Sequence, residues 1–433
     1  MPGLGIDRLP EQLDSDLVMR KATAADAAPL GEFLTEVMGF VRTPDDLRRW
    51  TPDLLSPTHP QAKSMLILIV EHIATRQIVS HISMITQTWQ YGSVPFRAAE
   101  LEMVATHPDW RNRGLIRTQI ELIHEYCDAN DIAVVGTIGI PNYYRQFGHV
   151  YALSHQRGRI PDIQLLEKCR ELQPRFQLRA SVVEDLALIS ELGRQATDRL
   201  LFSCLRDLED WHYELHGKHP ESAVVYEFLT ITDEAGTPVG VIASTVTKIQ
   251  PYNDVVMLEL SPEISWIDCL PDVLVELARI HPDNPPVLLL GEQHPSYSVL
   301  PRVMERESRG TSWYFRIADL AGFLHHVRCE LTRTLRAHPN GNISGNLNLS
   351  CYSSGLQIEI EHGEVIRVDP MKPSAIRPDA SFDRDDLMRL ITGNRSFSEL
   401  EADSPSNWTN NDRTRAILEM LFPKRDSHIW AAQ

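Results

Sequence analysis

The chain of 433 residues has few cysteines and no apolar run long enough to cross a membrane. Its longest unbroken apolar stretch, residues 65–70, is far shorter than the roughly 20 residues that a membrane helix needs. The N-terminus has no basic region followed by an apolar segment, so we expect a cytoplasmic protein without membrane contact. The six cysteines lack paired spacing, which favours reduced thiols over disulfides or a metal site.

Positive charge is also scarce. Lysine and arginine number 42 against 59 aspartates and glutamates, a formal net charge of −17. Binding to a phosphate backbone needs a basic surface, so we expect no nucleic-acid partner. The acidic balance suits a cationic substrate such as an amine, although acidic surfaces also simply keep proteins soluble. The length exceeds one ordinary core and predicts two to three domains.

The most informative stretch is a short apolar strand, expected at residues 101–106, followed by a basic turn and a helix, expected at 115–126. Gly114 lies at this junction, where the first helical N–H groups have no partner and the helix dipole is positive. An anionic phosphate can take those hydrogen bonds. Gly114 allows close approach of the backbone, and Arg111, Arg113 and Arg117 add positive charge. The pattern predicts a diphosphate cradle; the alternative is an ordinary basic surface turn.

A second apolar run, residues 133–140, leads into Tyr144-Arg-Gln-Phe147-Gly148. Strand, basic glycine turn, helix, strand and Tyr-x-x-Phe-Gly together resemble the acetyl-CoA site of the GCN5-related N-acetyltransferase (GNAT) superfamily. Arg111-x-x-Gly114-x-Ile116 matches that family's Arg/Gln-x-x-Gly-x-Gly/Ala turn at the first two positions and departs from it at Ile116.

An internal repeat relates residues 19–26 to residues 178–185, because Arg20 aligns with Arg179 and Asp26 with Asp185. Each copy begins a unit of strand and helix, in which Asp26 is expected to be structural. The strands expected at 224–233, 239–248 and 255–260 echo the first half, but no basic glycine turn follows them. We interpret this part as a degenerate second acetyltransferase-like domain that has lost coenzyme binding.

The last third changes character. Apolar and polar residues alternate at 343–351 and 356–360, and more apolar positions follow at 365–368; helical patterns follow at 384–392, 398–402 and 412–421. This small sheet with its helices looks like the sterol-carrier-type fold.

The whole arrangement resembles the enhanced-intracellular-survival (Eis) type of N-acetyltransferase. The segments that carry the resemblance are the glycine turn, the Tyr144 segment, residues 313–319, which would close the second domain, and Leu421-Phe-Pro423. The predicted fold class is α/β (α+β). Two tandem GNAT-like mixed-sheet domains, residues 1–160 and 161–326, precede a sterol-carrier-like α+β domain, residues 327–433, whose tail would enter the active site. The resemblance also implies a homo-oligomer, a hexamer.

The resemblance further implies acetyl-CoA as cosubstrate, no metal, and a set of contact residues on the fourth strand, the glycine turn and the segment before the catalytic tyrosine. These are Val104, Ala105, Thr106, Asn112, Arg113, Gly114, Leu115, Ile116, Arg117, Gly139 and Ile140. Tyr144 would be the general acid, because a phenol with a pKa near ~10 is protonated at neutral pH and can donate to a departing thiolate. Adjacent Tyr143 and a mere packing role for Tyr144 are the alternatives.

In the Eis type the base is the C-terminal carboxylate, and the matching group here is the main-chain carboxylate of Gln433. A terminus without any role is the alternative. Glu102 is the rival base, since many other acetyltransferases place a glutamate there. His107 and His149 lie near the motifs and are expected to be structural.

The resulting hypothesis is an acetyl-CoA-dependent N-acetyltransferase in which a primary amine of a small cationic molecule or a lysine attacks directly. Two alternatives stay open. One is a non-catalytic binding protein that uses the acetyltransferase and sterol-carrier-like scaffold to hold a ligand. The other is an acyltransferase that accepts longer acyl chains.

Overall fold

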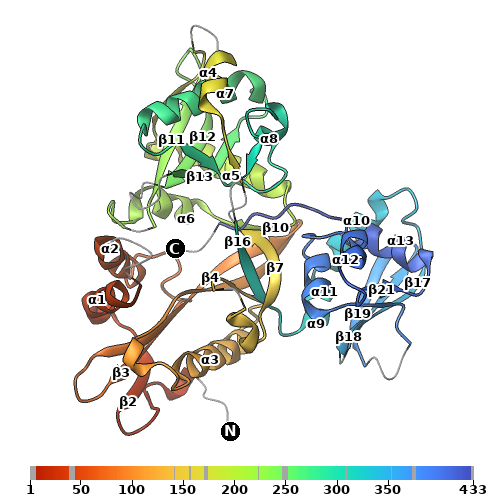
Figure 1. Cartoon of the computed structure of the whole chain (residues 1–433), viewed down its shortest axis with the longest axis horizontal. Helices are drawn as coiled ribbons and strands as arrows, with labels where there is room; N and C mark the ends of the chain where they lie inside the picture. Colours follow the sequence, from red (N-terminus) through yellow and green to blue (C-terminus); the bar gives the residue numbers. More distant parts are fainter. Residues whose placement is uncertain are drawn as a thin grey trace.

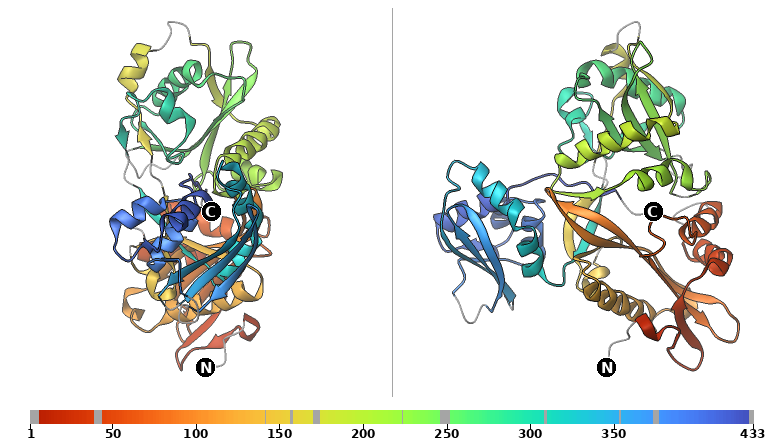
Figure 2. Two further views of the ribbon diagram at one scale, coloured as in Figure 1. Left: turned by 90° about the vertical axis from the view of Figure 1, so that its right-hand side faces the viewer. Right: turned by 180° about the vertical axis from the view of Figure 1, so that it is seen from behind.

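The computed structural model describes residues 6–38, 44–140, 142–155, 158–169, 174–222, 224–245, 252–307, 310–352, 354–372 and 377–430. Within these residues three β-sheets form, and each is the centre of one lobe of the molecule (Figure 1). Figure 2 shows the same lobes from the side and from behind. Helices and mixed sheets combine in this way throughout, which confirms the predicted α/β fold class. Among the described helices, none has both the length and the apolar character needed to cross a membrane.

The first sheet holds nine of the described strands, in the order β1-β2-β3-β4-β5-β6-β16-β7, with β10 paired to β4. Their bounds are β1 (Glu11–Gln12), β2 (Leu17–Lys21), β3 (Leu66–His72), β4 (Ile78–Tyr91), β5 (Val94–Thr106), β6 (Val134–Ile138), β7 (Val150–His155), β10 (Phe202–Leu205) and β16 (Thr311–Arg316).

Helices cover both faces of this sheet. Helix α3 (Leu115–Ala129) packs on one face through Ile116, Ile120 and Ile123, which share a core with Leu101. Helices α1 (Ala27–Met38) and α2 (Pro44–Leu54) pack on the other face, with Ile85, Met103 and Ala105. Alternate residues of a strand point to opposite faces, so the apolar residues of β4 and β5 serve both cores.

The second sheet repeats the strand order of the first. Its strands β9 (Gln177–Ala180), β11 (Tyr226–Thr232), β12 (Pro238–Thr245), β13 (Asn253–Leu260) and β14 (Pro286–Leu288) follow the succession β2-β3-β4-β5-β6, and the last pair is parallel in both sheets. Strands β8 (Arg159–Ile160) and β15 (Arg306–Glu307) extend its edge. The helices of this lobe are α4 (Ile163–Cys169), α5 (Leu186–Asp198), α6 (Leu208–His212), α7 (Trp266–Ile280) and α8 (Pro295–Val299).

The sequence repeat corresponds to the same ion pair in both sheets. Arg20 donates to Asp26 at 2.7 and 2.9 Å, and the Thr23 N–H donates to the same carboxylate at 2.8 Å. In the second copy Arg179 donates to Asp185 at 2.6 and 2.8 Å. Each carboxylate caps the turn that begins the following helix, which confirms the structural role expected for Asp26.

Two strands of the first sheet come from later in the chain. Strand β10 pairs with the end of β4, and β16 lies between β6 and β7. The expectation that residues 313–319 close the second domain is therefore corrected for β16. Its apolar side chains explain the placement, because Trp313 and Phe315 pack against Trp89 and Phe202 of the first lobe.

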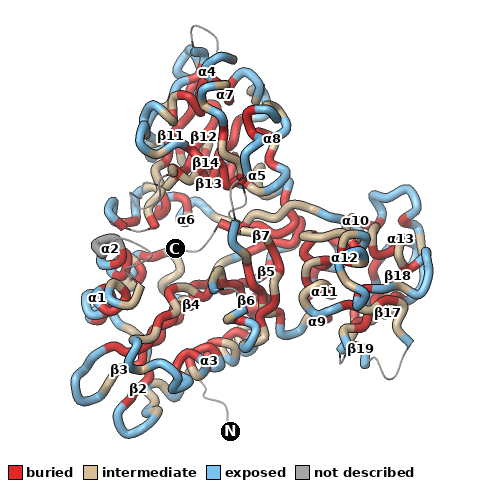
Figure 3. Tube along the Cα trace, viewed as in Figure 1, coloured by how far each residue is buried: buried red, intermediate tan, exposed pale blue. Residues whose placement is uncertain are grey.

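The third sheet runs in the order β19-β18-β17-β20-β21. Its strands are β17 (Gly345–Cys351), β18 (Ser354–Glu361), β19 (Glu364–Met371), β20 (Ala380–Ser381) and β21 (Trp408–Thr409), and its helices are α9 (Leu320–His326), α10 (Arg328–Ala337), α11 (Arg384–Ile391), α12 (Phe397–Asp403) and α13 (Asp412–Leu421). This lobe shares one continuous core with the first sheet. Figure 3 shows buried residues along β4 to β7, where the lobes meet.

The Asp26 ion pair gives a pH-dependent stability prediction. The hydrogen bonds from Arg20 lower the pKa of Asp26 from the usual 3.8 to about 2. A lowered folded-state pKa stabilises the protein above about pH 4, and this contribution disappears as the pH falls toward 2. Asp26→Asn should therefore lower the free energy of unfolding by about 2 kcal/mol at pH 7, measured by urea denaturation.

The difference between wild type and Asp26→Asn should shrink as the pH falls from 5 toward 3 on this scale. Asp185→Asn is the matched variant in the second copy and should change stability in the same direction. Equal stability of wild type and Asp26→Asn at pH 7 would contradict the assignment.

Candidate active site

Strands β5 and β6 pair side by side at first and then separate, and we call the point of separation the fork. Their parallel pairing covers only Ala98–Val134, Ala99–Val135 and Glu100–Gly136, whereas β5 continues to Thr106. At the start of the fork the Thr137 hydroxyl donates to the Leu101 carbonyl at 3.2 Å. Beyond it, Val104, Ala105 and Thr106 lie on the arm of β5 that has parted from β6. The predicted strand contacts therefore lie on a stretch of β5 that is not paired with β6, and a strand edge of this kind can pair with an extended ligand.

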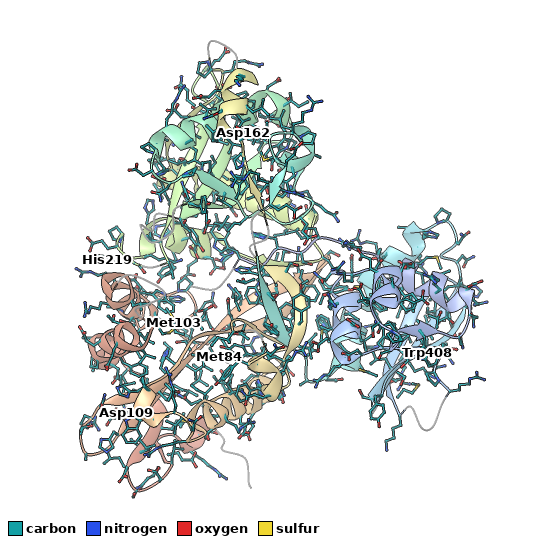
Figure 4. The ribbon with its side chains drawn as sticks, viewed as in Figure 1. Met84, Met103, Asp109, Asp162, His219 and Trp408 are labelled. Atoms are coloured by element: carbon teal, nitrogen blue, oxygen red, sulfur yellow. The ribbon has the colours of Figure 1, made fainter. Side chains whose placement is uncertain are left out.

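A β-bulge distorts β5 at this fork. Ser83 pairs with Glu102 and His81 with Ala105, so Met103 and Val104 together face only one residue of β4. Met103 has a positive φ of 51°, which costs a residue with a side chain on the order of 1–3 kcal/mol. Figure 4 labels Met103 on the sheet of the first lobe.

The bulge sets which face each residue of β5 uses. Glu102 pairs with Ser83 and Ala105 with His81, so both point toward the face of α1 and α2. Val104 packs in the core of α3, on the opposite face. Without the extra residue, Glu102 and Val104 would share a face.

The glycine turn has the geometry that phosphate binding requires. Asn112 and Gly114 have positive φ values of 63° and 77°, and a Cβ added at Gly114 would meet no atom within 4 Å. The Thr118 N–H is the first to bond back, to the Gly114 carbonyl at 3.0 Å. The N–H groups that precede it at the start of α3 have no acceptor within the helix. The residues present thus fit a diphosphate group.

Exposed arginine side chains flank this turn. The Arg113 guanidinium lies 4.6 Å from the centre of the Trp110 ring, and Arg117 donates to Gln146 at 2.9 Å. Leu115 and Ile116 differ from them, because both side chains are buried in the core beneath α3. The departure from the family motif at Ile116 is therefore accommodated in the core, and only the backbone of these two residues can reach a ligand.

Helix α3 is tied to the sheet by a buried polar link. Gln119 accepts a hydrogen bond from Ser80 of β4 at 2.7 Å and donates to the Leu68 carbonyl of β3 at 3.2 Å. Both Gln119 and Ser80 are fully buried. The link holds the first turns of α3 against β3 and β4. Sequence reasoning missed Gln119, although a glutamine among the apolar positions of a helix is a usable signal.

Tyr144 begins the short 3₁₀ helix η4 (Tyr144–Phe147) and is buried, with 6% of its surface exposed. Its ring lies against Gly139, where an added Cβ would approach Tyr144 Cε2 to 2.3 Å. Burial raises the pKa of Tyr144 well above its ordinary value; the Thr137 hydroxyl opposes this, and the charge of Glu102 adds to it. Tyr144, Thr137, Gly139 and Glu102 thus come together at the fork, whereas Ile140 is 70% exposed.

Neighbouring residues serve other roles. Tyr143 is half-buried, and burial raises its pKa. His149 is fully buried, and its ring centre lies 5.3 Å from that of His124 and 6.0 Å from that of Tyr144. Burial lowers the pKa of His149 to about 3, so it is neutral at pH 7. The Nε2 atom of His107 lies 3.3 Å from the Oε1 atom of Glu36.

A polar cavity of about 300 Å³ lies between the first and second lobes. Ile85 and Gln87 of β4 line it, on the face that Glu102 shares. Its other wall includes Asp207, Asp210 and Glu214, from α6 and the adjoining π-helical turn η6 (Tyr213–Gly217). Burial raises the pKa of Asp210. Glu214 is paired with Lys218 at 2.7 Å and lies 3.8 Å from Arg206. Asp207 and Asp210 are therefore the acidic groups that can favour a cation in the cavity.

The two lobes are joined beside this cavity. The His219 N–H donates to Asp53 of α2 at 2.8 Å, and Figure 4 labels His219 beside the helices of the first lobe. Gln61 donates to Asp210 at 3.1 Å. The second lobe is therefore a structural wall of the cavity.

The end of the chain runs between the lobes. His428 donates through its N–H to the Phe202 carbonyl at 3.0 Å, and Asp426 accepts from Leu201 at 2.8 Å. Trp430 is buried among aromatic rings, with Arg206 4.6 Å above its centre. Arg206 also lines the acidic cavity. Gln433, the predicted base, lies outside the described residues.

Comparison with known proteins agrees with this geometry. Residues 18–152 match a family model described as an acetyltransferase (GNAT) domain. A search of curated proteins finds no match.

Solved structures share the fold over nearly the full length. A conserved protein of unknown function from Enterococcus faecalis V583, described as a probable N-acyltransferase, has a TM-score of 0.68 at 11% identity and covers 97% of this chain and 100% of its own. A GCN5-related N-acetyltransferase from Kribbella flavida has a TM-score of 0.64 at 13% identity, with 96% and 97% covered. Eis1 from Mycobacterium abscessus has a TM-score of 0.57 at 14% identity, with 95% and 98% covered.

The domain match shows that the first lobe carries an acetyltransferase domain, and the solved structures share the fold of the chain. More narrowly, residues 18–152 form a GNAT domain, and GNAT domains use acetyl-CoA as cosubstrate.

The contact between Gly139 and Tyr144 gives a testable consequence. Gly139→Ala would place a methyl group against the ring, so Tyr144 must shift. A displacement of about 1 Å at a catalytic group costs on the order of 100-fold in rate, and we expect kcat to fall by about that factor. Glu125→Ala, at an exposed position of α3 outside the predicted contact set, is the control and should keep full activity. An unchanged kcat in Gly139→Ala would show that the position of Tyr144 does not matter.

Proposed function

We propose that the protein is an acetyl-CoA-dependent N-acetyltransferase whose acceptor is the primary amine of a small cationic molecule or of a lysine. The observation that carries the proposal is the fork between β5 and β6, which has the open Gly114 turn at one end and buried Tyr144 at its base. The acidic cavity on the opposite side of the sheet from α3 supports a cationic acceptor.

The donor side would be held mainly by backbone. N–H groups at the start of α3 and at Asn112 to Gly114 would bind a diphosphate, with Arg113 and Arg117 adding charge. The free arm of β5, residues 104–106, would pair with an amide-bearing chain as a neighbouring strand does. Bound acetyl-CoA would supply an activated acetyl thioester. These roles correspond to the set predicted from the family resemblance, with Leu115 and Ile116 acting through their backbone alone.

Tyr144 would hold the proton that the leaving sulfur needs. Its raised pKa keeps the hydroxyl protonated across the physiological range, which a general acid requires. The burial of its ring beside Gly139 orients the hydroxyl and excludes water.

For the base we propose the Gln433 main-chain carboxylate, with Glu102 as the rival. Three residues span at most about 10 Å, so the terminal carboxylate can reach only groups within about that distance of Trp430, which packs against Arg206 at the wall of the acidic cavity. Glu102 has support from the structure, because it faces the acceptor side and its charge acts on Tyr144. Hexameric assembly, a cytoplasmic location and the sterol-carrier-like character of the third lobe stay predictions from the sequence.

Tyr144→Phe tests the acid directly. Loss of general acid catalysis typically costs 10²–10⁴-fold, so kcat should fall by about that range while the KM for acetyl-CoA changes little. Because the pKa of Tyr144 is raised, wild-type kcat should show no loss from this residue up to about pH 10. The assay is steady-state acetyl-CoA consumption with a panel of polyamines, aminoglycosides and lysine peptides.

Tyr143→Phe is the matched control and should retain wild-type kcat. If no amine is acetylated and calorimetry detects no binding of acetyl-CoA, the enzyme proposal fails and a binding protein takes its place.

Trp430 gives a test of the tail. Its ring centre lies 5.1 Å from that of Tyr226 and 5.5 Å from that of Trp211, so it anchors the described end of the chain. Deletion of residues 432–433 should lower kcat by about tenfold or more if the terminal carboxylate acts as base. Trp430→Ala should give a similar loss, because the tail is then no longer held.

Trp430→Phe keeps an aromatic ring and should restore most of the activity. Glu102→Gln distinguishes the rival. If Glu102→Gln abolishes the acidic limb of the pH profile while the tail deletion leaves kcat unchanged, Glu102 is the base.

A further inference from the structure

His81 lies in β4 directly beneath the bulge of β5. Its side chain is fully buried, and Nδ1 lies 2.8 Å from the Met103 carbonyl oxygen. Because a carbonyl can only accept, Nδ1 must carry the proton. The other ring nitrogen, Nε2, lies 3.0 Å from the Ser83 hydroxyl and is therefore the acceptor of that bond. Ser83 therefore donates a hydrogen bond to His81, and His81 donates one to the Met103 carbonyl.

The bond serves a backbone group that needs a partner. Met103 is 8% exposed and its φ is positive. A buried carbonyl without a hydrogen bond is strongly unfavourable, and a bulge takes its residues out of the regular ladder. The imidazole gives this carbonyl a hydrogen bond in the bulged conformation, and loss of the bond would make that conformation less stable. Burial also lowers the pKa of His81 to about 4, which keeps the ring neutral at pH 7.

We propose that His81, supported by Ser83, is a positioning residue for acetyl transfer. By holding the Met103 carbonyl it keeps Glu102 on the acceptor face and the neighbouring Val104 on the face of α3. The inference rests on the proposed function, in which this arm of β5 meets the acetyl donor. His81 itself touches neither substrate.

Side-chain replacements can separate the hydrogen bond from the packing. The amide nitrogen of asparagine lies where His Nδ1 does, so His81→Asn retains a donor to Met103. His81→Leu fills similar space without a donor. Ser83→Ala removes only the hydrogen bond to His81 Nε2, which favours the tautomer with the proton on Nδ1. If His81→Leu yields no folded protein, His81→Gln replaces it, because the longer side chain moves the amide away from the Nδ1 position.

The first measurement is kinetic, on the full chain. His81→Leu should lower kcat/KM for acetyl-CoA by at least about tenfold, and His81→Asn should recover most of that loss. Ser83→Ala should lie between them. Thermal unfolding of each variant shows whether activity follows stability. A purely structural role would reduce stability and activity in parallel, without rescue by asparagine.

The second measurement does not need turnover. Amide hydrogen exchange over residues 101–106 should be faster in His81→Leu than in wild type, and His81→Asn should return it toward the wild-type rate. Equal exchange in wild type and His81→Leu overturns the inference even if the enzyme is active. Normal protection in wild type, loss of protection in His81→Leu and no acetyl-CoA binding in wild type would overturn the proposed function, while the role of His81 in holding residues 101–106 would stand.

Discussion

The parting of β5 from β6 is the constraint on which the rest of this molecule depends. Parallel strands normally continue side by side, and leaving their polar backbone groups without partners is unfavourable. Here the cost is limited because the Thr137 hydroxyl bonds the Leu101 carbonyl at the fork and His81 bonds the Met103 carbonyl just beyond it. Side chains thus take over from the ladder where the strands separate, and the opening they stabilise lies between the glycine turn and Tyr144.

The two faces of the first sheet have different tasks, and the bulge keeps them separate. On one side α3 presents its N-terminus, anchored through buried Gln119. On the other, Glu102 and the acidic cavity face the second lobe. One additional residue in β5 is enough to place Glu102 and Val104, which would otherwise share a face, on opposite sides of the sheet. A small backbone irregularity thus determines where donor and acceptor chemistry can meet.

Much of the fold could be predicted from local pattern. Helix α13 has the expected bounds, Asp412–Leu421, and the strands of both repeats follow their apolar runs. The glycine turn could also be placed, because Asn112 and Gly114 adopt the positive φ values that such residues favour. Tyr144 is indicated by the family resemblance, and its catalytic role stays a prediction. The Arg20–Asp26 pair showed the repeat, since both partners lie within seven residues.

What could not be predicted depends on contacts between distant segments. Nothing local to Trp313 or Phe202 indicates that β16 and β10 complete a sheet begun much earlier in the chain. The bulge at Met103 contains no glycine that would indicate it in the sequence. His81 is a single histidine in a buried strand, which is no specific signal. The acidic cavity combines residues of two lobes, so no single stretch of sequence contains it.

The insertion of β16 between β6 and β7 has a consequence for how the protein is made. Among the described residues β7 does not pair with β6, and β16 lies between them and joins β7 to the rest of the sheet. When residues 1–155 have been synthesised, β6 and β7 exist but the strand that lies between them does not. That strand, β16, is made only after the second lobe. The sheet is therefore completed only after residues 311–316 have been synthesised, and a shortened chain that ends after the GNAT match would lack the strand that joins β7 to β6.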